Sequence, residues 1–156
     1  MKGRETMGIL TGCGLGLWDM WNGFWTFWSR KMAGEKTFVQ KLDELFSMHL
    51  PEKYYEHNED NTEECLVGGY VHGNEPSHHV PYLYAWTSQP WKTQYWLREI
   101  LNKMYKNDIN GLGGNDDCGQ MSAWYLFSVM GFYPVCPGTD QYVLAASANC
   151  SKLFPE

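Results

Sequence analysis

The chain has 156 residues, of which 44% are hydrophobic and 16% aromatic, so it can bury one modest core and is not a disordered tail. Its formal net charge of −6 disfavours nucleic acid as a partner, because binding to phosphates requires clustered lysines and arginines. No apolar run approaches the roughly 18 residues that a membrane helix needs, and no apolar stretch follows the early basic residues. The sequence therefore predicts neither a membrane span nor a signal peptide.

The cysteines form no CxxC pair, which argues against a tetrahedral zinc site built from close pairs. Their odd number, five, also argues against a complete disulfide framework. Cys118 and Cys136 would be able to pair in an oxidising compartment, although free buried thiols are the preferred interpretation.

Residues 1–31 differ in character from the rest of the chain. They hold six of the sixteen glycines and four of the eight tryptophans, without a sustained helical or strand period. Beyond them, Thr37 is predicted to cap a helix that runs to Met48, since the apolar residues Phe38, Leu42, Leu45 and Phe46 recur at helical spacing. Residues 49–65 are acidic and polar and predict a solvated loop.

Three further helices are predicted. The first covers residues 78–86, with proline in its first turns. The second covers residues 93–105 and carries one apolar stripe, made of Leu97, Ile100, Leu101 and Met104. The third begins near Gln120 and ends at Gly131 in the C′ position, before a turn and a short strand. At least two of Trp86, Trp91 and Trp124 are expected in the core. The layout indicates an all-α scaffold whose polar, glycine-bearing loops present a site.

One candidate site lies in the loop Gly114-Asn115-Asp116-Asp117, directly before the third of these helices. A carboxylate at a helix N-terminus is favoured in its ionised form, which is the form that a general base requires. The alternative is that Asp116 or Asp117 simply caps the helix.

A second candidate site is the segment His72-Gly73-Asn74-Glu75-Pro76. An amide oxygen and a carboxylate are hard ligands of the kind that Ca²⁺ prefers, whereas the adjacent His78 and His79 point in different directions and are poorly placed to share one metal ion. Calcium is therefore favoured over zinc. The alternative is that Glu75 caps the following helix and the histidines are ordinary surface or core residues.

Taken together, the strings HGNEPSHHVPYLYAWTSQPWKTQ and GLGGNDDCGQMSAWYLFSVMGFYPVCPGTDQYV resemble the two signature stretches of glycoside hydrolase family 92, and the resemblance runs over about residues 32–144. It implies a calcium-dependent, inverting exo-α-mannosidase in which an N-terminal β-sandwich precedes an (α/α)6 barrel. This chain would then be part of that barrel, and its partner would be the missing N-terminal portion of the same enzyme. The family implies a secreted, periplasmic or cell-surface location.

The resemblance also implies roles for individual residues. Asp117 matches the general base that activates water, with Asn115 beside it, and Asn74 and Glu75 match the loop that coordinates calcium. In the family this ion binds the O2 and O3 hydroxyls of mannose. The remaining two matches, His72 and His79, would line the substrate pocket. The implied substrates are mannose-containing glycans, with terminal α-1,2-linked mannose removed from N-glycans or mannans.

Two features depart from the family pattern. Asn115 stands where relatives commonly carry an acidic residue. The general acid of the family belongs to a Thr-Glu-Gly-Asn-like motif, and the corresponding stretch here, residues 10–14, contains no Glu. A shifted reading frame over residues 3–31 is one explanation, and the tail 145–156 also leaves the pattern. The alternative function is a non-catalytic remnant that binds calcium or carbohydrate and lacks the acid.

Overall fold

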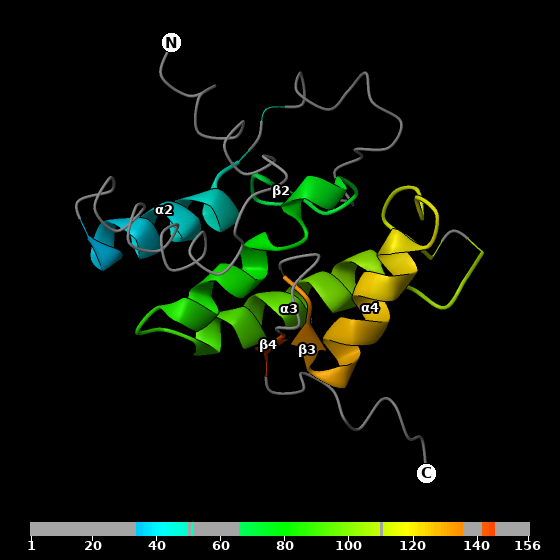
Figure 1. The fold of residues 1–156 in the computed structure, drawn as a ribbon. Coiled ribbons are helices and arrows are strands. Elements are labelled where there is room, and N and C mark those ends of the chain that lie inside the picture. The colour runs from blue at the N-terminus through cyan, green and yellow to red at the C-terminus, as the bar shows by residue number, and fades with distance from the viewer. Residues whose placement is uncertain (1–33, 50, 52–65, 110, 136–141, 146–156) are drawn as a thin grey trace.

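Short helices joined by loops make up most of the described structure, with two small antiparallel strand pairs (Figure 1). The computed structural model describes residues 34–49, 51, 66–109, 111–135 and 142–145. The atypical segment 1–31 and nearly all of the predicted loop 49–65 and tail 145–156 lie outside these residues. The predicted all-α scaffold is confirmed in part, since helices predominate in the described residues but two short strand pairs accompany them. None of the described helices is long and apolar enough to cross a membrane.

Helix α2 spans Glu35–Ser47 and buries one face, formed by Phe38, Val39, Leu42 and Phe46. The predicted cap at Thr37 is wrong, because the helix begins two residues earlier and Thr37 lies in its first turn. Gly34 occupies the N-cap position with a φ of 111°, a conformation that costs a glycine little. The apolar period located the helix correctly, whereas its start is set by this glycine.

A tight hairpin follows, in which β1 (Leu66–Val67) pairs with β2 (Tyr70–Val71). The turn packs against the end of α2, where the Gly69 amide donates to the Leu45 carbonyl at 2.7 Å. Gly68 has a φ of 62°, and a Cβ there would lie 2.3 Å from the Phe46 carbonyl oxygen. Only glycine fits this approach, which fixes the hairpin beside α2.

The predicted helix 78–86 is realised as two short 3₁₀ helices, η3 (Glu75–Ser77) and η4 (Val80–Trp86). Both carry proline in their first positions. Proline has no N–H and disrupts the turn before it, so the segment forms short tight turns instead of one α-helix. Most of η4 is buried nevertheless, from Val80 to Tyr84.

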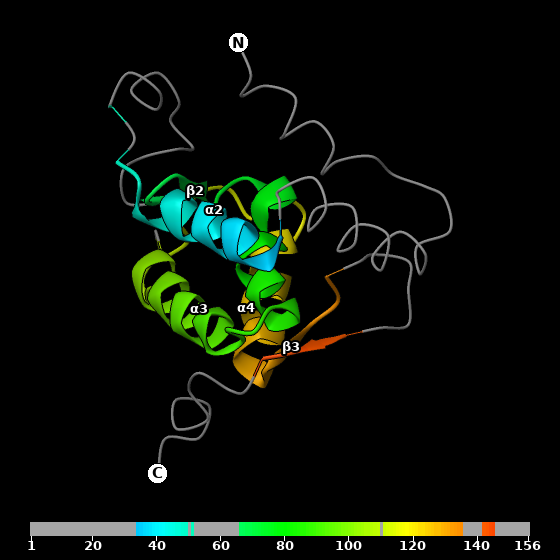
Figure 2. The ribbon, with the colours of Figure 1, turned by 90° about the vertical axis from the view of Figure 1, so that its left-hand side faces the viewer.

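Helix α3 spans Trp91–Met104, and its predicted stripe is confirmed, since all four residues are buried. The helix packs mainly on η4. Its Lys92 forms an ion pair with Asp43 of α2 at 2.5 Å, and the Tyr84 hydroxyl of η4 donates to the same carboxylate at 2.9 Å. These contacts tie α2 to α3, which lies below it in Figure 2.

Helix α4 spans Gln120–Met130 and ends at Gly131, whose φ of 86° confirms the predicted C-terminal glycine. The chain then forms β3 (Phe132–Tyr133), which pairs with β4 (Val143–Leu144). The second pair of strands agrees with the short strand predicted after this helix.

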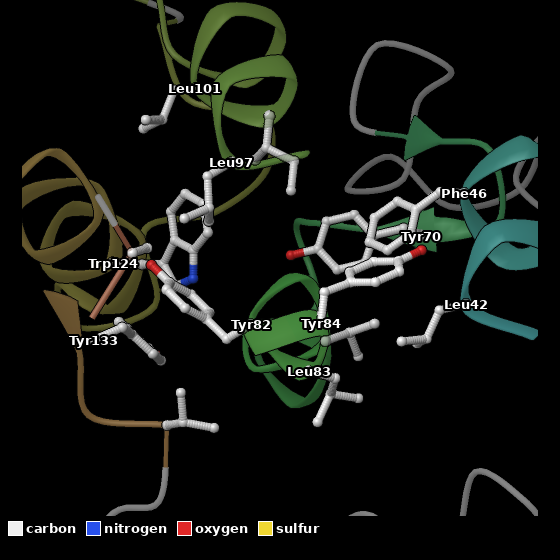
Figure 3. Packing of buried hydrophobic residues seen from close by; sticks show 14 of the residues in the cluster. Leu42, Phe46, Tyr70, Tyr82, Leu83, Tyr84, Leu97, Leu101, Trp124 and Tyr133 are labelled. Carbon is white, nitrogen blue, oxygen red and sulfur yellow. The ribbon is translucent and has the colours of Figure 1, made fainter. Parts of the chain in front are cut away.

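The core lies around η4, which sits between α2 and α4 (Figure 3). Tyr82 points toward α4 and β3. Its ring stacks on Tyr133 of β3 with centroids 4.9 Å apart and meets Trp124 of α4 edge-on. Tyr84 points the other way, toward Phe46 of α2. The expectation that at least two of the three singled-out tryptophans are core residues is wrong: Trp124 is fully buried, but Trp86 and Trp91 are 39% and 58% exposed.

One buried hydroxyl near the start of α3 lacks a hydrogen-bond partner within the described ranges, that of Thr93. Replacing Thr93 with Val keeps the shape and removes this desolvated group, so we expect the free energy of unfolding to rise by about 1 kcal/mol in urea denaturation. Thr87→Val is the matched control, because the Thr87 hydroxyl donates to the Tyr84 carbonyl at 2.8 Å and accepts from the Gln89 amide at 3.0 Å. That variant should lose stability, and a loss in both would contradict the expectation.

Candidate active site

The loop before α4 separates the roles of its two aspartates. The Asp116 carboxylate accepts a hydrogen bond from the Ser122 amide at 2.9 Å, and the Asp116 carbonyl accepts from the Met121 amide at 3.2 Å. Asp116 therefore satisfies free N–H groups in the first turn of α4, which is the capping alternative considered for this pair. The Asp117 carboxylate is not used in that way.

Asp117 begins a left-handed turn that leads into α4. Asp117 and Cys118 have φ values of 47° and 58°, and Gly119 follows with 91°. Such a conformation costs a residue with a side chain free energy, and positions of this kind cluster at functional sites. Asp117 is exposed, and so is Asn115, two positions before it. The turn therefore presents an exposed carboxylate at a helix N-terminus.

Cys118 is a free, exposed thiol in the same turn. The preferred interpretation of free buried thiols is thus wrong for this cysteine, whose side chain is free but exposed. Its considered partner, Cys136, lies outside the described residues.

The second loop connects β2 to η3. Asn74 is exposed and Glu75 half-buried, and their backbone carbonyls accept from the amides of Ser77 and His78 at 2.9 and 3.0 Å. These bonds form the η3 turn and occupy the two backbone carbonyls. The side-chain amide of Asn74 and the carboxylate of Glu75 are therefore the groups that a ligand would contact. The alternative that Glu75 caps the following helix is wrong, because Asn74 is the N-cap residue, Glu75 is the first residue of η3, and no side-chain capping bond is formed.

The donor chemistry of this loop suits calcium. Ca²⁺ takes about six to eight oxygen ligands, and Asn74 and Glu75 supply an amide and a carboxylate oxygen next to each other in sequence. Within the described ranges, no three histidine, cysteine, aspartate or glutamate residues gather as a metal cluster. The loop thus matches calcium in the type of ligand, and the other oxygens of a complete shell would come from a sugar, water or other parts of the polypeptide.

His72 is fully buried, and both of its ring nitrogens form hydrogen bonds to tyrosines. Nδ1 lies 2.8 Å from the Tyr70 hydroxyl and Nε2 lies 2.7 Å from the Tyr105 hydroxyl. Tyr105 donates its proton to the Met121 carbonyl at 3.1 Å, so it accepts from Nε2–H, and Nδ1 accepts from Tyr70. Contact between this ring and a sugar would require one of these bonds to be exchanged.

His78 is also buried, and its ring lies between the two loops. Nε2 is 2.9 Å from the His72 carbonyl, and Nδ1 is 3.2 Å from Nε2 of Gln120, the first residue of α4. The His78 carbonyl accepts from the Trp124 indole at 3.0 Å. His79 has a different partner and bonds to the Pro76 backbone. The participation of Gln120 was not predicted, since glutamine at a helix start carries no sequence signal for such a contact.

The histidine environments predict how stability depends on pH. Burial lowers the pKa of His72 to about 2, and burial, partly offset by the bond to Pro76, lowers the pKa of His79 to about 4. In the unfolded chain both histidines have a pKa of about 6.5. Below that pH the unfolded state binds more protons than the folded state, so the free energy of unfolding falls.

We therefore expect the urea midpoint to fall steadily as the pH is lowered from about 6.5 to about 4, with each neutral histidine contributing up to about 1.4 kcal/mol per pH unit. Burial also lowers the pKa of His78, so the variant His79→Gln should flatten this slope only in part, by removing one of three such groups. A midpoint independent of pH over this range would contradict the burial of neutral histidines.

Comparisons with known proteins identify the family of the chain. A family model, the glycosyl hydrolase family 92 catalytic domain, matches residues 28–149. An uncharacterized secreted glycosidase of Arthroderma benhamiae is 31% identical over 113 residues, covering 72% of this chain and 12% of that protein. The structure of a family 92 α-mannosidase from Bacteroides thetaiotaomicron is similar with a TM-score of 0.63 and 46% identity, covering 74% of this chain and 14% of that one. The chain thus spans a small part of the length of these relatives. Because the family model covers most of its residues, the chain belongs to glycosyl hydrolase family 92.

Proposed function

We propose that this chain is the active-site part of an α-mannosidase catalytic domain that hydrolyses terminal mannose, α-1,2-linked in N-glycans or mannans. The observation that carries the proposal is that the two neighbouring aspartates have different roles in the loop. Asp116 caps α4, which leaves the exposed Asp117 carboxylate on a left-handed turn at the helix N-terminus. Family membership and the similarity to an α-mannosidase structure supply the substrate class.

In this proposal Asp117 is the general base. It would take a proton from the water that attacks the anomeric carbon, with the Asn115 amide helping to orient that water. An inverting reaction needs a second carboxyl roughly 6.5–9.5 Å away, which protonates the departing oxygen. We propose that this acid belongs to the motif that is absent from residues 10–14, and that a shifted reading frame over residues 3–31 accounts for its absence. The encoding DNA tests this, since no frame of it should yield Glu-Gly-Asn if the idea is wrong.

Asn74 and Glu75 would hold Ca²⁺ in the proposed site. When bound, the ion supplies Lewis-acid polarisation and a template for neighbouring sugar hydroxyls. The protein's own contribution is to fix the loop through the η3 backbone bonds. His79 would contact the sugar, and His72 would support the pocket wall from behind, because both of its ring nitrogens are bonded to tyrosines.

The surface of α4 supports a larger assembly. Besides its buried side, the helix exposes Tyr125, Leu126 and Met130 by 37%, 55% and 50%. A helix that is apolar all round is normally covered on more than one side. We therefore propose residues 32–144 as part of an (α/α)6 barrel, with the N-terminal portion of the same enzyme as partner. A secreted, periplasmic or cell-surface location is proposed with it, in line with the name of the Arthroderma relative.

The test is mannose release from α-1,2-linked mannobiose, with calcium and with a chelator, by this chain and by a longer polypeptide that includes the N-terminal portion and restores the reading frame over residues 3–31. Release by the longer form that stops on chelation supports the proposal. If neither form releases mannose but the chain binds calcium and mannose in calorimetry, the alternative of a non-catalytic binding remnant is correct. Neither release nor binding would overturn both functions.

A further inference from the structure

The two candidate loops are joined by one side-chain bridge inside the structure. The His78 ring reaches the His72 carbonyl, directly before Gly73-Asn74-Glu75, at 2.9 Å. On its other side the ring reaches Gln120, directly after the turn that Asp117 begins, at 3.2 Å. A single imidazole ring thus connects two segments that lie 42 positions apart in the sequence.

The proton positions in this bridge follow from the partners. A backbone carbonyl only accepts hydrogen bonds, so His78 Nε2 must carry the proton that it donates to His72. In the neutral ring Nδ1 is then an acceptor, and Gln120 must offer it an N–H. The second N–H of the same amide donates to the Tyr133 hydroxyl at 3.2 Å. Both hydrogens of the Gln120 amide are therefore used, which fixes the orientation of its side chain.

Neighbouring groups also restrain this bridge, which consists of the contacts from His72 through His78 to Gln120. The Trp124 indole fixes the His78 backbone through its carbonyl, and the Trp124 ring is fully buried. At the other end, Asp117, Cys118 and Gly119 are all left-handed. A turn of this kind persists only where its surroundings determine it. Gln120 follows the turn immediately and is anchored at two points, so it is the side chain best placed to do this.

We infer that Gln120 is a positioning residue, which holds the Asp117 turn in register with the Asn74-Glu75 loop through His78. The inference rests on the proposed function for its catalytic meaning, while the mechanical link between the loops stands on the contacts alone. Gln120 itself would touch neither sugar nor metal.

The test uses Gln120→Met, which keeps the length of the side chain and removes both donors. Ser128→Ala is the matched control: it breaks another buried bond of α4, between Ser128 Oγ and the Tyr82 hydroxyl at 2.6 Å, that leads to neither loop. Amide hydrogen exchange is followed at Ser77 and His78 in one loop and at Gln120 and Met121 in the other, since all four amides donate to backbone carbonyls.

We expect Gln120→Met to speed exchange at both pairs of amides by about fivefold, the equivalent of one lost hydrogen bond, and Ser128→Ala to leave both pairs close to the parent protein. Faster exchange at Gln120 and Met121 alone would overturn the bridge. If Gln120→Met does not fold, Tyr133→Phe removes one of the two amide acceptors and should give the same paired effect at about twofold. An effect confined to one loop in that variant would equally overturn the bridge.

Activity and calcium binding then separate this inference from the proposed function. In a polypeptide that releases mannose, Gln120→Met should lower kcat or calcium affinity by about 10–100-fold with a smaller change in KM, and Ser128→Ala should change neither. If the parent protein neither binds calcium nor releases mannose, the proposed function fails while hydrogen exchange still decides the bridge. Paired exchange with an unchanged kcat and calcium affinity would leave the link intact and overturn its positioning role.

Discussion

Replacing Asp117 with Asn is expected to lower kcat for mannose release by about 10²–10⁴-fold, the usual contribution of a general base. The substitution keeps the shape of the side chain and its tolerance of a left-handed backbone, so the turn should survive. What it removes is the negative charge, and with it the basicity that lets the carboxylate take a proton from water. KM and calcium affinity should change little, because Asp117 is assigned to neither ligand. The measurement is steady-state release from α-1,2-linked mannobiose in the longer, active polypeptide.

Asp116→Asn provides the matched control for this experiment. It removes the same charge one residue away, and asparagine caps helices about as well as aspartate, so the bond from the Ser122 amide should be kept. Its kcat should stay within a few-fold of the parent protein. Equal losses of kcat in the two variants would show that the reaction depends on the charge of the loop. They would contradict the assignment of Asp117 as the base. A full loss in Asp116→Asn alone would reverse the assignment of the two aspartates.

The sequence predicted the regular parts of the fold for identifiable reasons. The stripe of α3 and the glycine that ends α4 follow from local rules of spacing and backbone conformation, and both are confirmed. The start of α2 and the 3₁₀ character of residues 75–86 were missed. In the first case Gly34 competes with Thr37, and in the second two prolines prevent a continuous α-helix in a segment whose apolar residues still recur as in a helix.

The candidate site was predictable to a different extent. The loops of Asp117 and Glu75 stand out because polar and glycine residues precede a helix, and the resemblance to the family gave them roles. The capping by Asp116 was an open alternative, and only the contact with Ser122 assigns it to one residue. The links between the loops depend on side chains that are far apart in sequence. Neither the burial of His72 between two tyrosines nor the contact of Gln120 with His78 leaves a local pattern to read.

Trp124 gives the largest expected effect on stability. Its side chain is fully buried, packs edge-on against His72 with ring centroids 4.4 Å apart, and donates to the His78 carbonyl at 3.0 Å. Trp124→Ala should lower the free energy of unfolding by about 3–5 kcal/mol through lost burial and the cavity that remains. A domain of this size commonly has only about 5–15 kcal/mol in total, so the variant should be largely unfolded in mild urea.

Two further variants separate the causes of that loss. Trp124→Phe keeps an aromatic ring but leaves the His78 carbonyl without its donor, and it should cost about 1–3 kcal/mol. Trp91→Ala removes a tryptophan that is 58% exposed, and it should cost less than about 0.5 kcal/mol. Urea denaturation followed by circular dichroism measures all three. Because the indole fixes the backbone of His78, Trp124→Phe should also speed exchange at the His78 amide, whereas Trp91→Ala should not. Equal losses for Trp124→Ala and Trp91→Ala would contradict the placement of Trp124 at the centre of the core.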